Sequence, residues 1–270
     1  MSNSSIAATH LKDGDLPAAL KALQDEVRAK PADAKLRVFL FQLLSVLGQW
    51  ERALNQLNVA AELDAATLAM AQMYREAIRC ELLRAKVFAG GTAPMVFGQP
   101  EQWLAFLIES LLVGGRGRPN EAAELRAQAF ELAPTSSGTL DGKPFEWIAD
   151  ADSRLGPVLE VILNGKYYWV PFTRLATVHI EAPEDLRDVV WMPAHIQFTN
   201  GGETVAVIPT RYAGSEAGSD AAIALARKTI WEESGPDTYH GLGQRVLATD
   251  SGETAIMEVR HITLEEQLAA

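Results

Sequence analysis

Cysteine, basic residues and long apolar runs are all scarce in this sequence of 270 residues. Its single cysteine, Cys80, excludes an internal disulfide framework and any cysteine-rich zinc site. The chain has 24 Lys and Arg against 35 Asp and Glu, a formal net charge of −11, so we expect no nucleic-acid partner. The longest apolar run, Trp103 to Val113, is interrupted by Glu109 and Ser110 and is too short to span a bilayer.

The start of the chain carries none of the marks of an exported protein. The segment MSNSSIAATHLKDG has no basic region followed by an apolar stretch, so no secretory signal is visible. Apolar residues make up 48% of the chain, which is enough for one large or two ordinary domain cores. We therefore expect a folded cytoplasmic protein that does not insert into a membrane.

Charge divides the chain into two parts. Residues 1–135 contain 14 basic and 15 acidic side chains, whereas residues 136–270 contain 10 basic and 20 acidic ones. Turn-forming residues gather at this change, in the segment from Pro134 to Pro144. The sequence thus predicts two domains, 1–135 and 136–270, with nearly all of the net charge on the second.

A spacing of 34 residues recurs in the first part. Gly14 and Gly48 are 34 residues apart, and the apolar positions after each glycine match. Those positions follow the i, i+3, i+4, i+7, i+11 spacing of one helix face. The two matching sets are Leu16, Ala19, Leu20, Leu23 and Val27, and Trp50, Ala53, Leu54, Leu57 and Ala61.

A third, fainter copy repeats the same intervals from glycine to alanine and proline, at Gly117, Ala122 and Pro134. This period is the tetratricopeptide pattern, in which a small alanine lies where two helices cross. Each helix pair must stack on its neighbours to bury its apolar face. Residues 65–114 have lost the period, so we predict a degenerate tetratricopeptide-like array. The alternative is a set of ordinary amphipathic helices that share this spacing by coincidence.

One predicted helix has no polar face. In LRVFLFQLLSVL, residues 36–47, nine of twelve residues are apolar. Such a helix is either buried on several sides or presents aromatic surface to a partner. Core packing is likewise the alternative to partner contact for every aromatic residue of this region. The candidate partner-binding residues are Phe39, Phe41, Trp50 and Tyr74.

The second part alternates short β-rich runs with turns. VLEVIL (158–163) and KYYWVPF (166–172) flank Asn164-Gly165, the pair that suits a type I′ hairpin turn because both residues tolerate positive φ. Further β-rich runs cover 176–180, 203–210, 245–248 and 255–262, and helical patterns cover 184–190 and 220–231. Strands that follow one another without long helical crossovers predict an α+β domain with a mixed or antiparallel sheet.

No motif for catalysis or metal binding is complete. The five histidines form neither HExxH nor a close pair, and no GxSxG turn is present. We therefore expect no catalytic residue, no metal and no cofactor. Polar residues do gather in DADSR and EDLRD, and arginines follow later in the chain. The candidate polar network comprises Asp150, Asp152, Arg154, Asp185, Arg187, Asp188, Arg211 and Arg227.

This polar network has two interpretations. Asp side chains cap turns and pair with Arg to brace loops, and the missing nucleophile and base favour this interpretation. Alternatively, paired carboxylates such as Asp150 and Asp152 serve acid–base chemistry or bind a cation. The alternative predicts a pocket that gathers both of them, with Asp188 and Arg211, around open space.

Several long runs resemble one protein family. They are DADSRLGPVLEVILNGKYYWVPF, EAPEDLRDVVWMPA, NGGE, IPTRYAGSE and LARKTIW, between residues 150 and 231. The N-terminal run DLPAALKALQDEVRAKPADAKLRVFLFQLLSVLGQWERAL fits as well. In these runs the chain is similar to the ImpE family, also called SciE, which includes the TagJ-type accessory proteins of bacterial type VI secretion systems. The resemblance covers essentially the whole chain and brings no catalytic motif.

The resemblance implies a cytoplasmic, non-enzymatic adaptor. Proteins of the TagJ type bind the N-terminal helix of the small contractile-sheath subunit (TssB or VipA). They are linked to the ClpV unfoldase, which dismantles contracted sheaths. A helical-repeat surface that accepts an amphipathic helix is compatible with this role. Two alternatives stay open: an enzyme or cation-binding protein that uses the acidic residues, and a structural scaffold of the secretion baseplate.

Overall fold

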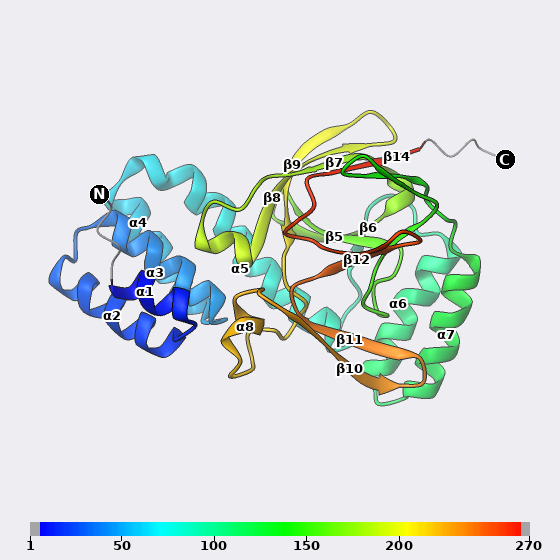
Figure 1. The fold of residues 1–270 in the computed structure, drawn as a ribbon, viewed down its shortest axis with the longest axis horizontal. Helices are drawn as coiled ribbons and strands as arrows, with labels where there is room; N and C mark the ends of the chain where they lie inside the picture. The colour runs from blue at the N-terminus through cyan, green and yellow to red at the C-terminus, as the bar shows by residue number, and fades with distance from the viewer. Residues whose placement is uncertain (1–5, 266–270) are drawn as a thin grey trace.

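Helix pairs form the first part of the chain and a β-rich part follows (Figure 1). The computed structural model describes residues 6–265, and no helix among them has both the length and the apolar character needed to cross a membrane. This order confirms the predicted α and β fold class. The helices are α1 (Ile6–Asp13), α2 (Leu16–Ala29), α3 (Ala34–Val46), α4 (Trp50–Leu63), α5 (Leu68–Phe88), α6 (Gln102–Gly115), α7 (Pro119–Leu132) and α8 (Ala221–Ala224), with 3-10 turns η1 (Ala65–Thr67), η2 (Phe172–Arg174) and η3 (Leu186–Val189).

Glycine turns join the helix pairs α1–α2, α3–α4 and α6–α7. Gly14, Gly48 and Gly117 lie between the helices of these pairs, with φ of +80°, +64° and +76°. This left-handed region favours glycine because it has no Cβ. Ala19 and Ala53, the small residues of the first two copies, have no exposed surface. The array of helix pairs predicted from the 34-residue spacing is therefore confirmed.

Helix α3 is buried on several sides, one of the two outcomes predicted for its apolar sequence. Every residue from Leu40 to Val46 is buried, including the polar Gln42 and Ser45. The hydroxyl of Ser45 donates to the carbonyl of Phe41 at 2.9 Å, which satisfies this polar group within the helix. Helices α2 and α4 and the turn η3 all contact α3.

The long helix α5 takes the place of a regular repeat. Its 21 residues contain neither Gly nor Pro, so nothing in the sequence ends the helix before Phe88. It runs from the helical array toward the sheet (Figure 1). The chain then contributes the short strand β1 to the sheet before α6 begins. This explains why the 34-residue period is lost between residues 65 and 114.

The β-rich part contains a nine-stranded sheet, a three-stranded sheet and a two-stranded ribbon. The nine-stranded sheet has the order β1-β6-β5-β9-β8-β7-β14-β2-β3, and the three-stranded sheet has the order β13-β12-β4. The pair β1–β6 is parallel and the other described pairs are antiparallel, which confirms a mixed sheet. The strands are β1 (Met95–Val96), β2 (Gly138–Leu140), β3 (Lys143–Phe145), β4 (Ile148–Asp150), β5 (Val158–Leu163), β6 (Lys166–Pro171), β7 (Leu175–Ile180), β8 (Trp191–Phe198), β9 (Glu203–Pro209), β10 (Thr229–Gly235), β11 (Thr238–Gly243), β12 (Val246–Thr249), β13 (Gly252–Ala255) and β14 (His261–Leu264).

The predicted hairpin around Asn164-Gly165 is confirmed. Strands β5 and β6 pair antiparallel over their full lengths, and the two turn residues have φ of +48° and +72°. Both values lie in the region that a type I′ turn requires. The local turn chemistry therefore fixes the register of the two strands.

Two predicted elements are wrong in part. The helix predicted over 220–231 ends at Ala224, because Ala226 has a φ of +52° and the chain then enters β10. The strand predicted over 255–262 is interrupted by a turn between β13 and β14. Ile256 and Val259 of this turn are fully buried, so the apolar pattern there supplies the core instead of a strand.

Two hydrophobic clusters stabilise the fold. The larger one contains Phe41 and Tyr74 from the helices together with Trp169, Trp191 and Tyr212 from the β-rich part. The smaller one joins side chains of the nine-stranded and three-stranded sheets. The larger cluster thus includes residues from both sides of position 135. A domain boundary at that position stays a prediction.

We expect Gly115→Ala to destabilise the protein by about 1–3 kcal/mol, because overpacking forces shifts in the backbone. A Cβ at position 115 would lie 2.5 Å from the carbonyl oxygen of Ala89 and 2.5 Å from the Cα of Gly90, where α6 meets the end of α5. Gly114→Ala is the matched control, since its Cβ would make only an ordinary 3.5 Å contact with Ala122. Urea unfolding of both variants measures the difference, and equal stabilities would contradict the close approach.

Candidate functional site: buried arginine networks between the helices and the sheet

Helix α5 carries two charged side chains, Glu81 and Arg84, on its buried face. Arg84 is 3% exposed and meets Glu160 of β5 in a bidentate pair, with Nε–Oε1 at 2.6 Å and Nη2–Oε2 at 2.8 Å. Oε1 of Glu81 accepts the indole N–H of Trp191 of β8 at 2.9 Å. Charge-assisted hydrogen bonds of this kind are short and strong, so they join α5 firmly to the sheet.

Glu160 has no exposed surface and is shared by two arginines. Its Oε1 also accepts the hydroxyl of Tyr167 at 2.5 Å, and its Oε2 lies 3.5 Å from Nη1 of Arg245. Burial alone would raise the pKa of Glu160, but Arg84 and Arg245 together hold it below its ordinary value. The carboxylate is therefore ionised at neutral pH.

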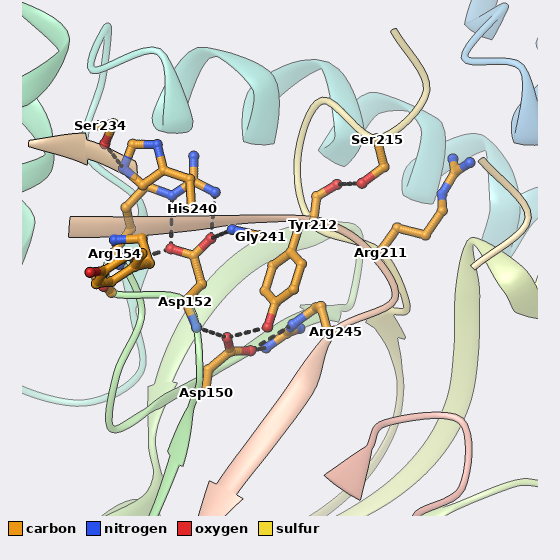
Figure 2. Close-up of polar contacts among 12 residues, drawn as sticks. Asp150, Asp152, Arg154, Arg211, Tyr212, Ser215, Ser234, His240, Gly241 and Arg245 are labelled. Carbon is orange, nitrogen blue, oxygen red and sulfur yellow. Dashed lines mark hydrogen bonds and ion pairs between the residues drawn. The ribbon is translucent and has the colours of Figure 1, made fainter. Parts of the chain in front are cut away.

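Arg245 connects Glu160 to a second buried carboxylate, Asp150. Its Nε and Nη2 donate to Oδ2 of Asp150 at 2.9 and 2.8 Å (Figure 2). Oδ1 of Asp150 accepts the hydroxyl of Tyr212 at 3.0 Å. Burial outweighs the attraction of Arg245 and raises the pKa of Asp150 to about 6. We call the series Arg84, Glu160, Arg245 and Asp150 the buried ionic chain.

Asp152 and Arg154 form a neighbouring pair. Nε and Nη2 of Arg154 donate to the two carboxylate oxygens of Asp152 at 2.9 and 2.5 Å, and the amide of Gly241 donates to Asp152 at 2.8 Å (Figure 2). The amide of Asp152 itself donates to Asp150 at 2.9 Å. The Arg154 guanidinium also lies 4.8 Å from the ring centre of Phe88. This pair thus fixes the loop after β4 against β11 and the end of α5.

Arg211 and Arg227 bind the ends of helices. Nη1 of Arg211 donates to the carbonyl of Val46, the last residue of α3, at 2.8 Å. Nη2 of Arg227 donates to the carbonyl of Leu11, in the last turn of α1, at 2.9 Å. Carbonyls in the last turn have no partner within their helix, and a cation there is favoured by the helix dipole. Burial lowers the pKa of Arg211 to about 10, so it still carries its charge at neutral pH.

The remaining members of the predicted network lie in and beside the turn η3. Asp185 and Asp188 form a capping box at this turn. Arg187 pairs with Asp185 at 2.5 Å, and its guanidinium lies 5.0 Å from the ring centre of Tyr74 of α5. Their contacts are therefore with this turn and with α5, not with the buried ionic chain.

The structure gives separate partners to the four residues that the catalytic interpretation gathered. Asp150 and Asp152 are paired with arginines. Asp188 accepts backbone amides, and Arg211 donates to backbone carbonyls. All four are at most 4% exposed. Asp150 and Asp152 do border a cavity of about 350 Å³ between α7 and β4, but their carboxylates are engaged as described. These contacts favour the bracing interpretation.

The four candidate partner-binding aromatics lie at or near the larger hydrophobic cluster. Phe41 has no exposed surface and Tyr74 is 3% exposed, and their ring centres are 5.8 Å apart. Trp50 is partly buried, with its ring centre 5.9 Å from that of Trp191. Phe39 is partly buried as well. A role in partner binding stays a prediction, and Phe39 and Trp50 are the two that are only partly buried.

Sequence reasoning missed three members of the buried ionic chain, Arg84, Glu160 and Arg245. A signal was present for Arg84 and Glu160. Arg84 stands at helical spacing from the apolar Ala77 and Cys80, and Glu160 interrupts the otherwise apolar run VLEVIL. A charged residue within an apolar pattern indicates a buried, paired charge, since an unpaired one would be very costly.

Three of the five histidines come together although the sequence shows no close pair. His261, His179 and His195 are register partners on β14, β7 and β8, and Nδ1 of His179 lies 3.2 Å from Nδ1 of His261. Within residues 6–265, no group of three potential ligands could hold a metal ion. His240 lies elsewhere, 2.9 Å from the hydroxyl of Ser234 (Figure 2). Burial, with Arg154 nearby, lowers the pKa of His240 to about 4.

Comparison with known proteins places this architecture in a family. The family model described as "ImpE protein" matches residues 142–263. The type VI secretion system accessory component TagJ of Pseudomonas aeruginosa strain PAO1 is 51% identical over 260 residues, which are 96% of this chain and 91% of TagJ. The chain belongs to the ImpE family. A crystal structure of protein VPA1032 from Vibrio parahaemolyticus, 27% identical in sequence, superposes on this chain with a TM-score of 0.88. The match covers 97% of this chain and 98% of the VPA1032 chain.

The segment that matches the ImpE model contains most of the buried ionic chain. Asp150, Glu160 and Arg245 all lie within residues 142–263, whereas Arg84 of α5 lies outside it. The helical array is nevertheless part of the shared architecture, because the Vibrio structure matches nearly the whole chain. Arg84 therefore connects the helices to the part of the buried ionic chain that lies in the ImpE segment.

We expect Glu160→Gln to lower the free energy of unfolding by about 3–5 kcal/mol, because it leaves two buried guanidinium groups short of a counter-ion. Asp25→Asn is the control, since Asp25 pairs with Arg28 on the surface with side chains 56% and 72% exposed. That change should cost less than about 1 kcal/mol. Urea denaturation measures the free energy of unfolding of both variants. A loss in Glu160→Gln as small as that in Asp25→Asn would contradict the stabilising role of Glu160 in the buried ionic chain.

The neutral state of His240 should make stability depend on pH. Its pKa is lowered from 6.5 to about 4, so between these two pH values the unfolded state binds a proton at His240 and the folded state does not. Stability present above pH 6.5 is therefore lost as the pH falls toward 4. His240→Gln should remove about 1–3 kcal/mol of this loss. Thermal unfolding of wild type and His240→Gln from pH 7 to pH 4 measures this difference. The contribution of Asp150 to stability changes with pH in the opposite direction, but Asp150 is present in both proteins, so its effect cancels in the comparison.

Proposed function

We propose that this protein is a cytoplasmic, non-enzymatic accessory protein of a bacterial type VI secretion system. The observation that carries the proposal is the 51% identity to the accessory component TagJ over 96% of the chain. The paired, buried state of the buried ionic chain and of Asp152 supports a structural role for those residues. No observation on the described residues favours the cation-binding or enzymatic alternative.

We further propose that the partner is the small subunit of the contractile sheath (TssB- or VipA-like), bound through its N-terminal helix. By holding that subunit, the protein would modulate disassembly of the sheath by the ClpV unfoldase, which it would contact only indirectly. An amphipathic helix binds by laying its apolar face into a hydrophobic groove. The protein therefore has to offer an exposed apolar concavity.

We assign this role to the cavity between α7 and β4, which we call the groove. It measures about 350 Å³ and is bordered by Phe130 and Trp147, whose side chains are 42% and 38% exposed. The Phe130 ring packs closely on the backbone of Gly156, where a Cβ would come within 2.5 Å of the ring atom Cε1 and 2.8 Å of Cζ. Exposed aromatic residues beside such a concavity are typical anchors of a protein interface.

Binding should require the N-terminal helix of the sheath subunit. Calorimetric titration of the full chain with the intact subunit should show saturable binding, and titration with a subunit that lacks its N-terminal helix should show none. Equal binding of both forms would overturn the proposed partner segment. Absence of binding to either form would overturn the adaptor function.

The groove is tested separately by Trp147→Ala, which should weaken binding about tenfold or more. Trp231→Ala is the matched control, because Trp231 on β10 has a similar exposure of 39% but lies outside the groove. If Trp147→Ala binds like wild type while Phe39→Ala or Trp50→Ala weakens binding, the helical array provides the surface instead.

A baseplate scaffold would be recognised by fluorescence microscopy, which would place the protein at the membrane complex instead of on the sheath.

A further inference from the structure

A second cavity lies between helices α6 and α7 and the ribbon β10–β11. It measures about 180 Å³, several times the roughly 30 Å³ that a water molecule occupies in the liquid. Gly114, Pro119 and Ser234 at its border are exposed, so small solutes can reach it. The polar residues that line it are Ser110, Arg126, Arg154, Ser234, Thr238 and His240.

Arg126 of α7 is a buried cation that makes no ion pair with any described residue. It is 5% exposed, yet no carboxylate of residues 6–265 lies within the 4.0 Å of an ion pair. Among these residues its hydrogen bonds all come from Nη2, which donates to the hydroxyl of Thr238 and, at 3.4 Å, to the carbonyls of Pro236 and Asp237. Nε and Nη1 make no hydrogen bond to another described residue, and the carboxylates of Asp152 and Asp237 act on Arg126 only from beyond ion-pair distance. Buried charges in proteins are normally paired, so this one indicates a missing anion.

Further donors border the same space. Arg154 uses Nε and Nη2 to bind Asp152, so Nη1 has no hydrogen bond to another described residue. The ring of His240 is bound to Ser234 through Nε2, and Nδ1 makes no such bond within residues 6–265. Asp152 pairs directly with Arg154, whereas Arg126 feels Asp152 and Asp237 only at longer range, so its charge is the less compensated of the two. Two guanidinium groups and a ring nitrogen from three separate segments thus face one small volume.

We propose that this cavity binds a phosphate group, with Arg126 as its principal charge partner. Guanidinium groups match the oxygen geometry of phosphate and bind it through charge-assisted hydrogen bonds. Donors on α7, β11 and the loop after β4 approach from different directions, which suits a tetrahedral anion better than a planar carboxylate. The site is distinct from the groove beside Trp147 and does not depend on the proposed sheath partner.

The first test is thermal unfolding and calorimetric titration of the full chain with inorganic phosphate at constant ionic strength. Wild type should show saturable binding and a matching rise in Tm, because a ligand that binds only the folded state stabilises it. Arg126→Met should weaken phosphate binding about tenfold or more, while its Tm without phosphate should equal or exceed that of wild type. Phosphate also stabilises proteins by exclusion from their surface, and the rise that persists in Arg126→Met measures this general effect.

Arg118→Met is the matched control. Arg118 precedes α7 and pairs with Glu121 on the surface, with side chains 51% and 47% exposed. This variant should bind phosphate like wild type. Equal phosphate responses of wild type and Arg126→Met would overturn the proposal, as would an equal loss in both variants.

A second measurement needs no variant. The ring resonances of His240 should shift saturably when phosphate is added to wild type, while those of His10, His179, His195 and His261, which do not line this cavity, should stay in place. Unmoved His240 resonances would overturn the proposal. Titration with glycerol 3-phosphate identifies the source of the phosphate group: if it binds as well as inorganic phosphate does, the ligand is a phosphate monoester, and if only inorganic phosphate binds, the ligand is the free ion. Titration with acetate tests the assigned chemistry, and acetate binding as strong as that of phosphate would contradict it.

Discussion

The bidentate pair between Arg84 and Glu160 is the interaction on which the arrangement of the helices and the sheet depends. It joins the 21-residue helix α5 to β5, an interior strand of the nine-stranded sheet, at 2.6 and 2.8 Å, with both side chains at most 3% exposed. Two charges buried this deeply are tolerated only where their geometry and remaining hydrogen bonds are satisfied. Tyr167, Arg245 and then Asp150 supply those hydrogen bonds and charges, so one buried pair requires a whole series of neighbours.

The helical array is attached to the same region by a different type of contact. Arg211 and Arg227 extend from the β-rich part and donate to carbonyls at the ends of α3 and α1. These bonds use backbone atoms, so they depend on where a helix ends and not on which side chains it carries. Hydrophobic contact does the rest, since Phe41 and Tyr74 of the array pack in one cluster with Trp191. The sheet thus anchors the array by charge at helix ends and by aromatic packing between them.

The period and turn chemistry of the sequence were sufficient to predict the helix pairs and the hairpin, because both depend on local residues such as Gly14 and Asn164. The same reasoning failed over residues 220–231, because Ala226 has a positive φ that ends the helix and no sequence rule predicts this conformation for an alanine. The buried ionic chain could be predicted only in part. Its members are separated by up to 161 positions, from Arg84 to Arg245, and pairing over such distances depends on the sheet topology. Glu160 in its apolar run is a signal of burial but does not name its partner.

Trp191 lies against both Trp50 and Tyr74, with ring centres 5.9 and 5.6 Å apart, and so covers the aromatic side of the array with a residue from far along the chain. A recombinant fragment that stopped near position 135 would lose this cover and present several large aromatic rings to water. Such a fragment would bind many unrelated proteins through this exposed apolar surface. Capture experiments with the fragment would therefore detect non-specific hydrophobic binding and not the native interaction surface. Interaction mapping in this family is therefore better served by point substitutions in the intact chain than by truncation.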